Sequence, residues 1–263
     1  PFSIALWVNP EARSDKTSVL IGNAHQKNTM FRGWDFYIDS VGHVAARLIS
    51  SLPHNYIHVR TQEEIPVDEW THLTMTYDGS ARAKGIQIYM NGKPCGEQVV
   101  YDRLYKSIKP VNMARTLENR GLRMGKSYRA FTGDNGIFRG MIDELAFYDV
   151  SIPENQIESV YSQSSQGKKP IVYDVENVGQ KSTFAALEEL RKQRLSMVDT
   201  IRELMVMEEL PVPKPAFVLN RGVYDQPMEQ VEVGTPEKVM GFSSNYPSNR
   251  YGLSQWLFDK RNP

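Results

Sequence analysis

The chain has 263 residues, and its 31 lysine and arginine residues equal its 31 aspartate and glutamate residues in number. This zero net charge provides no general field for nucleic acid or an anionic membrane, and we expect neither partner. No apolar stretch reaches the roughly 18 residues that a membrane-spanning helix needs. The single cysteine, Cys95, excludes an intrachain disulfide and a cysteine-based zinc site, and we expect it to be a small apolar residue that is buried or half-buried.

The first part of the chain, residues 2–149, carries the period-two alternation of half-buried strands. Strands are predicted at 2–8, 34–39, 43–49, 70–78, 85–92 and 97–102. Turns are predicted at 40–42, 78–80 and 91–93, where Gly, Asn and Asp accept positive φ. Many short strands without a long intervening helix predict a mainly β fold, an antiparallel β-sandwich or jelly roll.

After Asp149 the pattern becomes helical. Pro153 lies near a helix start, and apolar residues follow at spacings of three and four, which predicts a short helix closing a sandwich domain over 1–161. A linker is expected at 162–181. Apolar residues then recur near the helical period over 182–210, which predicts a long amphipathic helix. Its apolar stripe should pack on the sandwich, on the C-terminal segment or on a partner helix.

The C-terminal segment, 211–263, begins with three prolines within "LPVPKP". Proline removes a backbone donor and fixes φ, so an extended, Pro-rich segment is predicted there. "NRYGLSQWLFDKRNP" then predicts another helix, with Leu253, Trp256 and Leu257 on one side. We interpret this as the incomplete start of a further domain, and the opening "PFSIALWVNP" as typical of an excerpt from a longer chain.

Three groups of residues, in this order, form a specific combination. They are "FSIALWVNP", then "DEWTHLTMTYDGS" with "GIQIYMNGKP", and last "LRMGKS" leading to "FRGMIDELAFYDVSIPENQIESV". Through them, residues 2–161 resemble a laminin-G-like member of the concanavalin A-like lectin/glucanase superfamily. The resemblance implies a β-sandwich that recognises a glycan or a protein. The usual first strand of such domains, beside the last one, is not in this chain.

A second resemblance involves residues 205–239 and 248–263, including Arg221-Gly222 and the stretch "YDQP" at 224–227. These residues resemble the junction leading into the C-terminal domain of a planctomycete-type multidomain family. Its members join a cytochrome c module, a domain of unknown function, sometimes a laminin-G-like insert, and that C-terminal domain. Tyr251 stands where an aliphatic residue is commoner, and the haem-binding module is absent, so no haem is expected here. Export to the periplasm or cell surface is implied by this resemblance alone.

Asp143 and Glu144 adjoin within "GMIDELAFYD" at 140–149. Neighbouring side chains of a regular strand point to opposite faces, so we predict that the two carboxylates do not converge on one glycosidic bond. Resemblance to the glucanases would imply Glu-x-Asp-x-Glu, but positions 142, 144 and 146 are Ile, Glu and Ala. The histidines show neither H-E-x-x-H nor a companion G-x-S-x-G element, so no enzyme is predicted.

The laminin-G-like resemblance also implies a calcium ion near this strand. It implicates Asp143, together with Asp134 in the loop 134–136, because calcium prefers carboxylate and carbonyl oxygens from several segments. The alternative is an Asp143 that is merely solvated or hydrogen-bonded.

Three aromatic residues, Trp34, Tyr37 and Tyr56, are candidates for a sugar-stacking face. Trp7 and Trp70 are instead expected in the core because of their strand patterns. Two functions follow as alternatives. One is a non-catalytic recognition module for a glycan or protein within an exported multidomain protein, and the other is a structural insert that packs the adjacent domains and binds no ligand.

Overall fold

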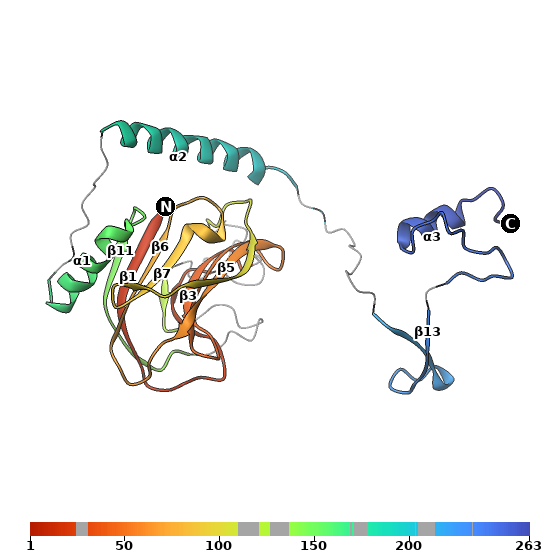
Figure 1. Ribbon diagram of the computed structural model, residues 1–263, viewed down its shortest axis with the longest axis horizontal. Coiled ribbons are helices and arrows are strands. Elements are labelled where there is room, and N and C mark those ends of the chain that lie inside the picture. Colours follow the sequence, from red (N-terminus) through yellow and green to blue (C-terminus); the bar gives the residue numbers. More distant parts are fainter. Residues whose placement is uncertain are drawn as a thin grey trace. The chain divides into compact units, whose positions relative to one another are not determined.

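The computed structural model describes residues 1–24, 31–109, 121–126, 137–168, 170, 178–202, 204, 214–232 and 234–263. The chain divides into two compact units, Pro1–Arg202 and Glu203–Pro263, each described by itself below. The first unit contains two antiparallel sheets that share one hydrophobic core (Figure 1). The predicted antiparallel β-sandwich is therefore confirmed.

One sheet has five strands in the order β11-β1-β6-β7-β8. Alternate residues of the first strand, such as Ile4 and Leu6, are buried between the sheets, and Ala5 packs on the opposite side. This is the alternation predicted for residues 2–8. The bounds are β1 (Phe2–Pro10), β6 (Thr71–Tyr77), β7 (Ile86–Met90), β8 (Lys93–Pro94) and β11 (Gly140–Tyr148).

The other sheet has six strands in the order β10-β2-β3-β4-β5-β9. The predicted hairpin around residues 40–42 is confirmed, because Ile38 pairs with Val44 and Trp34 pairs with Leu48. The bounds are β2 (Ser18–Gly22), β3 (Gly33–Ile38), β4 (His43–Ser51), β5 (Asn55–Glu64), β9 (Glu97–Arg103) and β10 (Arg123–Met124). Strands β2, β5 and β10 lie outside the predicted strands.

The core between the sheets holds fully buried side chains from both, among them Phe36, Leu48 and Leu73. Burying such a side chain stabilises the fold by about 1.5–3 kcal/mol. The expectation that Trp7 and Trp70 share this core is wrong. Trp7 has the orientation of Ala5 and lies half-buried on the outer face, while Trp70 precedes β6 and is 40% exposed.

Helix α1 (Glu154–Ser165) covers the outer face of the five-stranded sheet, which confirms the predicted short helix. Its Ile157 and Val160 pack against Ala5. Ser3 clips the segment that leads into the helix, since its hydroxyl donates to the Val150 carbonyl at 2.8 Å and accepts from the Ile152 N–H at 2.9 Å. Cys95 is buried as predicted, and this burial raises the pKa of its thiol to about 12.

Helix α2 (Val178–Asp199) begins before the predicted start at 182 and ends at Asp199, and residues 203 and 205–210 of the predicted helix lie outside the described residues. At its end the helix contacts the sandwich. The Asp199 carboxylate accepts from the Ser107 N–H at 2.9 Å, and Lys106 donates to the Ile201 carbonyl at 2.6 Å. Arg191 donates to the Asp78 carbonyl at 2.7 Å. Two of these contacts involve Asp199 and Ile201, at the point where the helix ends, and hydrophobic periodicity does not encode them.

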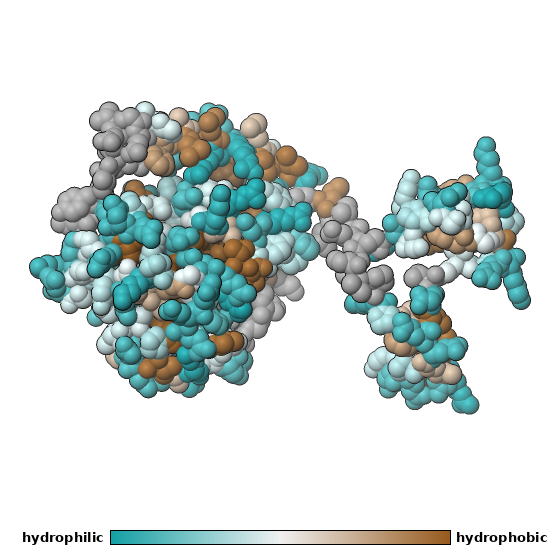
Figure 2. All heavy atoms as spheres, in the orientation of Figure 1, coloured by the Kyte–Doolittle hydropathy of each residue, from teal (hydrophilic) through white to brown (hydrophobic). Residues whose placement is uncertain are grey.

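The apolar stripe of α2 is largely uncovered. Exposed apolar side chains follow the helix and the residues just after it (Figure 2): Phe184, Leu187, Leu190, Met197 and Ile201. The predicted packing of the stripe on the sandwich is therefore limited to a few contacts. Among the described residues, no helix combines the length and the apolar character that crossing a membrane requires.

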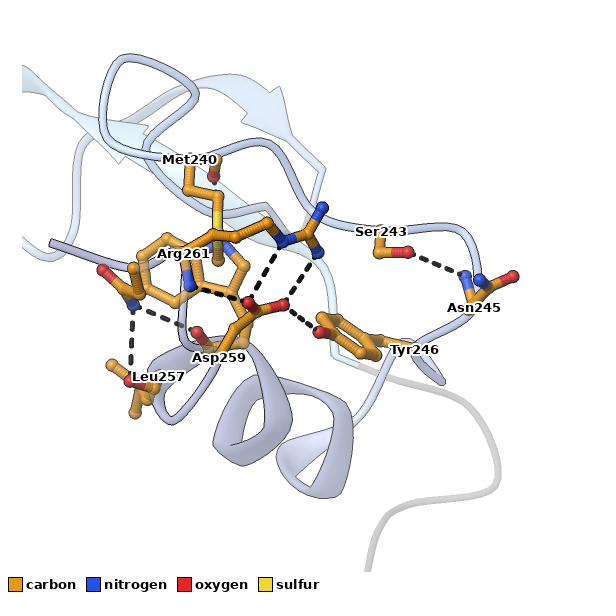
Figure 3. Close-up of polar contacts among 9 residues, drawn as sticks. Met240, Ser243, Asn245, Tyr246, Leu257, Asp259 and Arg261 are labelled. Carbon is orange, nitrogen blue, oxygen red and sulfur yellow. Dashed lines mark hydrogen bonds and ion pairs between the residues drawn. The ribbon is translucent and has the colours of Figure 1, made fainter.

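The C-terminal unit contains a hairpin of β12 (Ala216–Leu219) and β13 (Pro227–Val231), followed by α3 (Arg250–Leu257). The helix confirms the prediction made from "NRYGLSQWLF", whereas the hairpin was not predicted. Prolines 211 and 213 lie outside the described residues. Figure 3 shows how the end of the chain is held: Asp259 accepts from Tyr246 and, at 2.8 Å, from Arg261, and the Trp256 indole donates to the Met240 carbonyl at 2.9 Å.

Candidate functional site

A pocket of about 420 Å³ opens where the connections between strands meet. We call it the loop-end pocket, and its wall comes from residues 12–16, 38–39, 65, 67 and 137–139. These segments are distant in the sequence. Strand pairing brings them together, because Pro10 at the end of β1 pairs with Gly140 at the start of β11, and the Glu11 N–H donates to the Arg139 carbonyl at 3.1 Å. Loops on a rigid sandwich are a usual place for binding residues.

Two of the charged side chains in the pocket wall are already paired. Arg13 donates to Glu64 at 2.8 Å. Asp39 accepts three backbone N–H groups, from residues 41, 42 and 43, at 2.8–2.9 Å and lies 3.6 Å from Arg60. These partners offset the charges of Arg13 and Asp39, so both side chains serve mainly to hold the loops.

Three other charged residues of the wall, Asp15, Lys16 and Arg139, are exposed and form no ion pair with any residue of the described ranges. The wall also has an apolar part, in which Phe138 is half-buried and Ile137 is 59% exposed. None of these residues was predicted as a site residue. The charged run "EARSDK" at 11–16, interrupting a strand-rich region, is the signal that could have indicated a functional loop.

Trp34, predicted to stack on a sugar, packs instead against the core cluster. Its ring lies 5.7 Å from that of Phe2 and 6.2 Å from that of Phe147, measured between centroids. Trp34 and Tyr37 are an odd number of positions apart on β3, so their side chains leave opposite faces of the sheet. The structure therefore does not bring Trp34 onto one face with the two tyrosines.

Tyr37 lies on the outer face of the six-stranded sheet but is only 2% exposed. Its hydroxyl is 2.6 Å from Nε2 of His58, and the Arg47 guanidinium lies 4.0 Å from the centre of its ring. Arg47 also makes a bidentate ion pair with Asp35, at 3.0 and 3.2 Å. These contacts explain Tyr37 as a member of a buried polar network, and its ring is not accessible for stacking.

Tyr56 is half-buried and stacks on Tyr101 of the neighbouring strand β9, with centroids 4.2 Å apart and planes within 13°. The Tyr101 hydroxyl donates to the His54 carbonyl at 3.4 Å. Tyr101 was not predicted, because only the register of β5 and β9 brings it beside Tyr56. Of the three predicted stacking residues, Tyr56 alone retains partial exposure on the outer face.

Asp143 and Glu144 do not alternate as a regular strand requires. Trp7 pairs with Asp143 and Ala5 pairs with Ala146, so Leu6 faces two residues of β11, and the first of them, Glu144, has φ = 48°. This β-bulge places both carboxylates along one shallow depression of about 290 Å³, beside the two indoles at 7 and 70. The prediction that the pair points to opposite faces is wrong for this reason.

Hydrogen bonds hold both carboxylates of the bulge. Asp143 Oδ1 accepts the backbone N–H of Glu144 at 2.7 Å. Ser164 of α1 donates its hydroxyl to the Glu144 carboxylate and accepts from the Trp7 indole at 2.7 Å. The bulge is thus tied to the helix that covers this sheet.

Replacing Glu144 by glycine should give a more stable protein than replacing it by alanine, by about 1 kcal/mol. Both changes remove the carboxylate, but only glycine adopts positive φ without a steric cost. Urea unfolding of the two variants measures the difference. At Met141, an exposed residue earlier on the same strand, the order should reverse, because glycine weakens a regular strand. If the Glu144→Ala variant proved as stable as the Glu144→Gly variant, the prediction that positive φ at position 144 has a steric cost would be wrong.

The calcium prediction is only partly matched by these residues. Asp134 lies outside the described residues. One carboxylate oxygen of Asp143 already accepts a hydrogen bond from the Glu144 N–H. Among the residues that the structure describes, no three His, Cys, Asp or Glu side chains form a group that could hold a metal ion. Because calcium takes six to eight oxygens, Asp143 and Glu144 supply only a fraction of a coordination sphere. Calcium binding at Asp143 stays a prediction.

The sandwich, with loops gathered around a pocket at one end, has the architecture of a lectin-like domain. Comparison with protein families identifies it: residues 1–158 match the family described as the Concanavalin A-like lectin/glucanases superfamily. The chain belongs to this family, which confirms the first resemblance. Curated protein sequences provide no match.

Solved structures show more distant similarity. A protein of Bacteroides ovatus has 17% identity and a TM-score of 0.40, with 60% of this chain and 39% of that chain covered. A heptameric SAP-like pentraxin from Limulus polyphemus has 16% identity and a TM-score of 0.40, covering 67% and 77%. The CBM40 of the Ruminococcus gnavus IT-sialidase has 14% identity and a TM-score of 0.46, covering 61% and 82%. The present chain thus spans about two fifths of the Bacteroides protein.

Proposed function

We propose that the sandwich is a non-catalytic recognition module that binds a glycan in the loop-end pocket. One observation carries this proposal: four separate connections converge on a pocket of about 420 Å³ that combines an apolar wall with polar and charged side chains. Pockets of this size and mixed lining suit a small ligand such as a short stretch of sugar chain. Membership of a lectin-containing superfamily is consistent with this function.

The setting of the module is also part of the proposal. We place it outside the cytoplasm, in the periplasm or at the cell surface, as one part of a multidomain protein whose other domains lie beside it. This setting rests on the resemblance of residues 205–263 to the planctomycete-type family, which stays a prediction.

Glycan binding is tested by calorimetric titration of a panel of oligosaccharides, with calcium present and after chelation. We expect at least one to bind and Ala12→Trp to abolish that binding, because an indole at this exposed wall position fills the pocket. Asn155→Trp, on the exposed surface of α1, is the matched control and should bind normally. Loss of binding on chelation would support the calcium prediction.

Other outcomes of the same titration point elsewhere. Binding that survives Ala12→Trp but is lost in Tyr56→Ala and Tyr101→Ala would move the site to the stacked tyrosines. No binding to any glycan would favour the second function, a structural insert that packs adjacent domains. The observation behind that alternative is the uncovered apolar stripe of α2, since large exposed apolar patches mark surfaces that contact another part of a protein or a partner.

A further inference from the structure

We propose that the loop-end pocket selects an anionic glycan, one whose sugars carry carboxylate or sulfate groups. This inference rests on the proposed function and specifies the ligand class of the same site. It follows from the charges of the pocket wall, once those already satisfied within the protein are set aside.

The satisfied charges are those of Arg13 and Asp39. The Arg13 guanidinium pairs with Glu64, and Asp39 is held by three backbone N–H groups and faces Arg60. A ligand would have to compete with these partners, so neither side chain contributes much net charge to the pocket.

The remaining charges are those of Lys16, Arg139 and Asp15. None of them has an ion-pair partner within the described ranges, and all three are exposed at the pocket wall. Two cations against one carboxylate leave an excess of positive charge, in a pocket where a ligand is partly shielded from water. Coulombic attraction between charges strengthens as water is displaced, so this excess favours an anion over a neutral sugar.

The two cations come from two different connections of the pocket wall. Lys16 lies in the connection that follows β1, whereas Arg139 immediately precedes β11. The backbone of Arg139 is fixed by the hydrogen bond from Glu11 and by its neighbour Gly140. At Gly140, with φ = 140°, an added Cβ would lie 2.1 Å from the Asn9 carbonyl oxygen, so the two chain segments pass too closely for a side chain at this position.

This arrangement suits a charged sugar. A guanidinium presents a planar fork that binds carboxylate or sulfate oxygens in pairs, and an ammonium adds a second donor. Phe138 and Ile137, beside Arg139, offer an apolar surface for the less polar face of a sugar ring. A single sugar unit of a glycan could therefore bind the cations through its acidic group and the apolar side chains through its ring.

The decisive experiment compares oligogalacturonate with its neutral methyl ester, and carrageenan oligosaccharides with their desulfated forms, by calorimetric titration at physiological ionic strength. We expect at least one anionic member to bind roughly tenfold or more tightly than its neutral partner. Arg139→Gln and Lys16→Gln should each remove most of that preference, and Arg139→Glu should abolish anion binding. Lys84→Gln is the matched control and should change nothing, because Lys84 is an exposed lysine of the short 3-10 helix Ala83–Gly85, outside the pocket.

The outcomes separate this inference from the function on which it rests. Equal or tighter binding of the neutral partners, or anion binding unchanged in Arg139→Gln and Lys16→Gln, would overturn the anionic preference and leave glycan recognition intact. No binding by any member, charged or neutral, would remove both. Unchanged melting temperatures of the variants would show that lost binding is not lost folding.

Discussion

Replacing Asp35 by alanine should lower the free energy of unfolding by about 3–5 kcal/mol, because it leaves the Arg47 guanidinium buried without its carboxylate. The side chains of Asp35 and Arg47 are 1% and 9% exposed, and their ion pair is bidentate at 3.0 and 3.2 Å. Removing one partner lowers the free energy of unfolding by more than the ion pair contributes to it, because the remaining buried charge has neither its partner nor hydration by water. Urea unfolding followed by circular dichroism measures the change.

The control for this prediction is the exposed ion pair between Arg13 and Glu64, whose side chains are 40% and 50% exposed. Glu64→Ala should alter the free energy of unfolding by no more than about 1 kcal/mol, because water solvates the unpaired arginine. Replacing both buried partners, in Asp35→Leu with Arg47→Met, should recover part of the loss seen in Asp35→Ala. A change below about 1 kcal/mol in Asp35→Ala would contradict the prediction.

Acid should destabilise the sandwich through His72, by about 3 kcal/mol when the pH reaches 4. His72 lies on β6 beneath α1 and is 1% exposed. The centroid of its ring is 5.2 Å from that of Trp7 and 5.7 Å from that of Tyr161. Burial lowers its pKa from 6.5 to about 4, and no charged group contributes to that change. Nδ1 has no hydrogen-bond partner among the described residues, so nothing there stabilises an added proton.

The sign of this pH dependence follows from the difference in proton binding between the unfolded and the folded chain. Between pH 6.5 and 4 the unfolded chain binds a proton at this histidine and the folded chain does not, so stability falls as the pH falls through that window. Above pH 6.5 the effect is absent, and below pH 4 it is complete. Unfolding free energies measured across the window should show a weaker dependence in His72→Gln than in the natural protein. His54→Gln, at an exposed histidine, should leave the dependence unchanged, and equal slopes for all three proteins would refute the assignment.

Most of the sandwich could be predicted from hydrophobic alternation. The strands at 2–8, 34–39, 43–49, 70–78 and 85–92 are found close to their predicted positions, because each carries side chains that are buried between the sheets and the residue pattern records that burial. Helix α1 was predicted for the corresponding reason at the helical period. The extent of α2 was not, since contacts with residues 106–107 at its end, rather than its own periodicity, accompany the change of conformation.

The candidate site was largely beyond prediction. Its wall comes from segments as far apart as Lys16 and Arg139, and only strand pairing shows that they meet. Stacking residues chosen by type alone were distributed over both faces of a sheet: Trp34 packs toward the core, and Tyr37 is buried in a polar network. Tyr101 stacks on Tyr56, and no local sequence pattern predicts this pair.

By itself, the amino-acid sequence determined the class of fold, the positions of many of the strands and the family, because alternation and family motifs are local or keep a constant order along the chain. Only the tertiary structure decided which side chains act together. The bulge at Glu144 reverses the expected orientation of one carboxylate, and the convergence of four connections creates a pocket with an excess of positive charge. Both depend on pairing between residues distant in the chain, and that is information which periodicity does not carry.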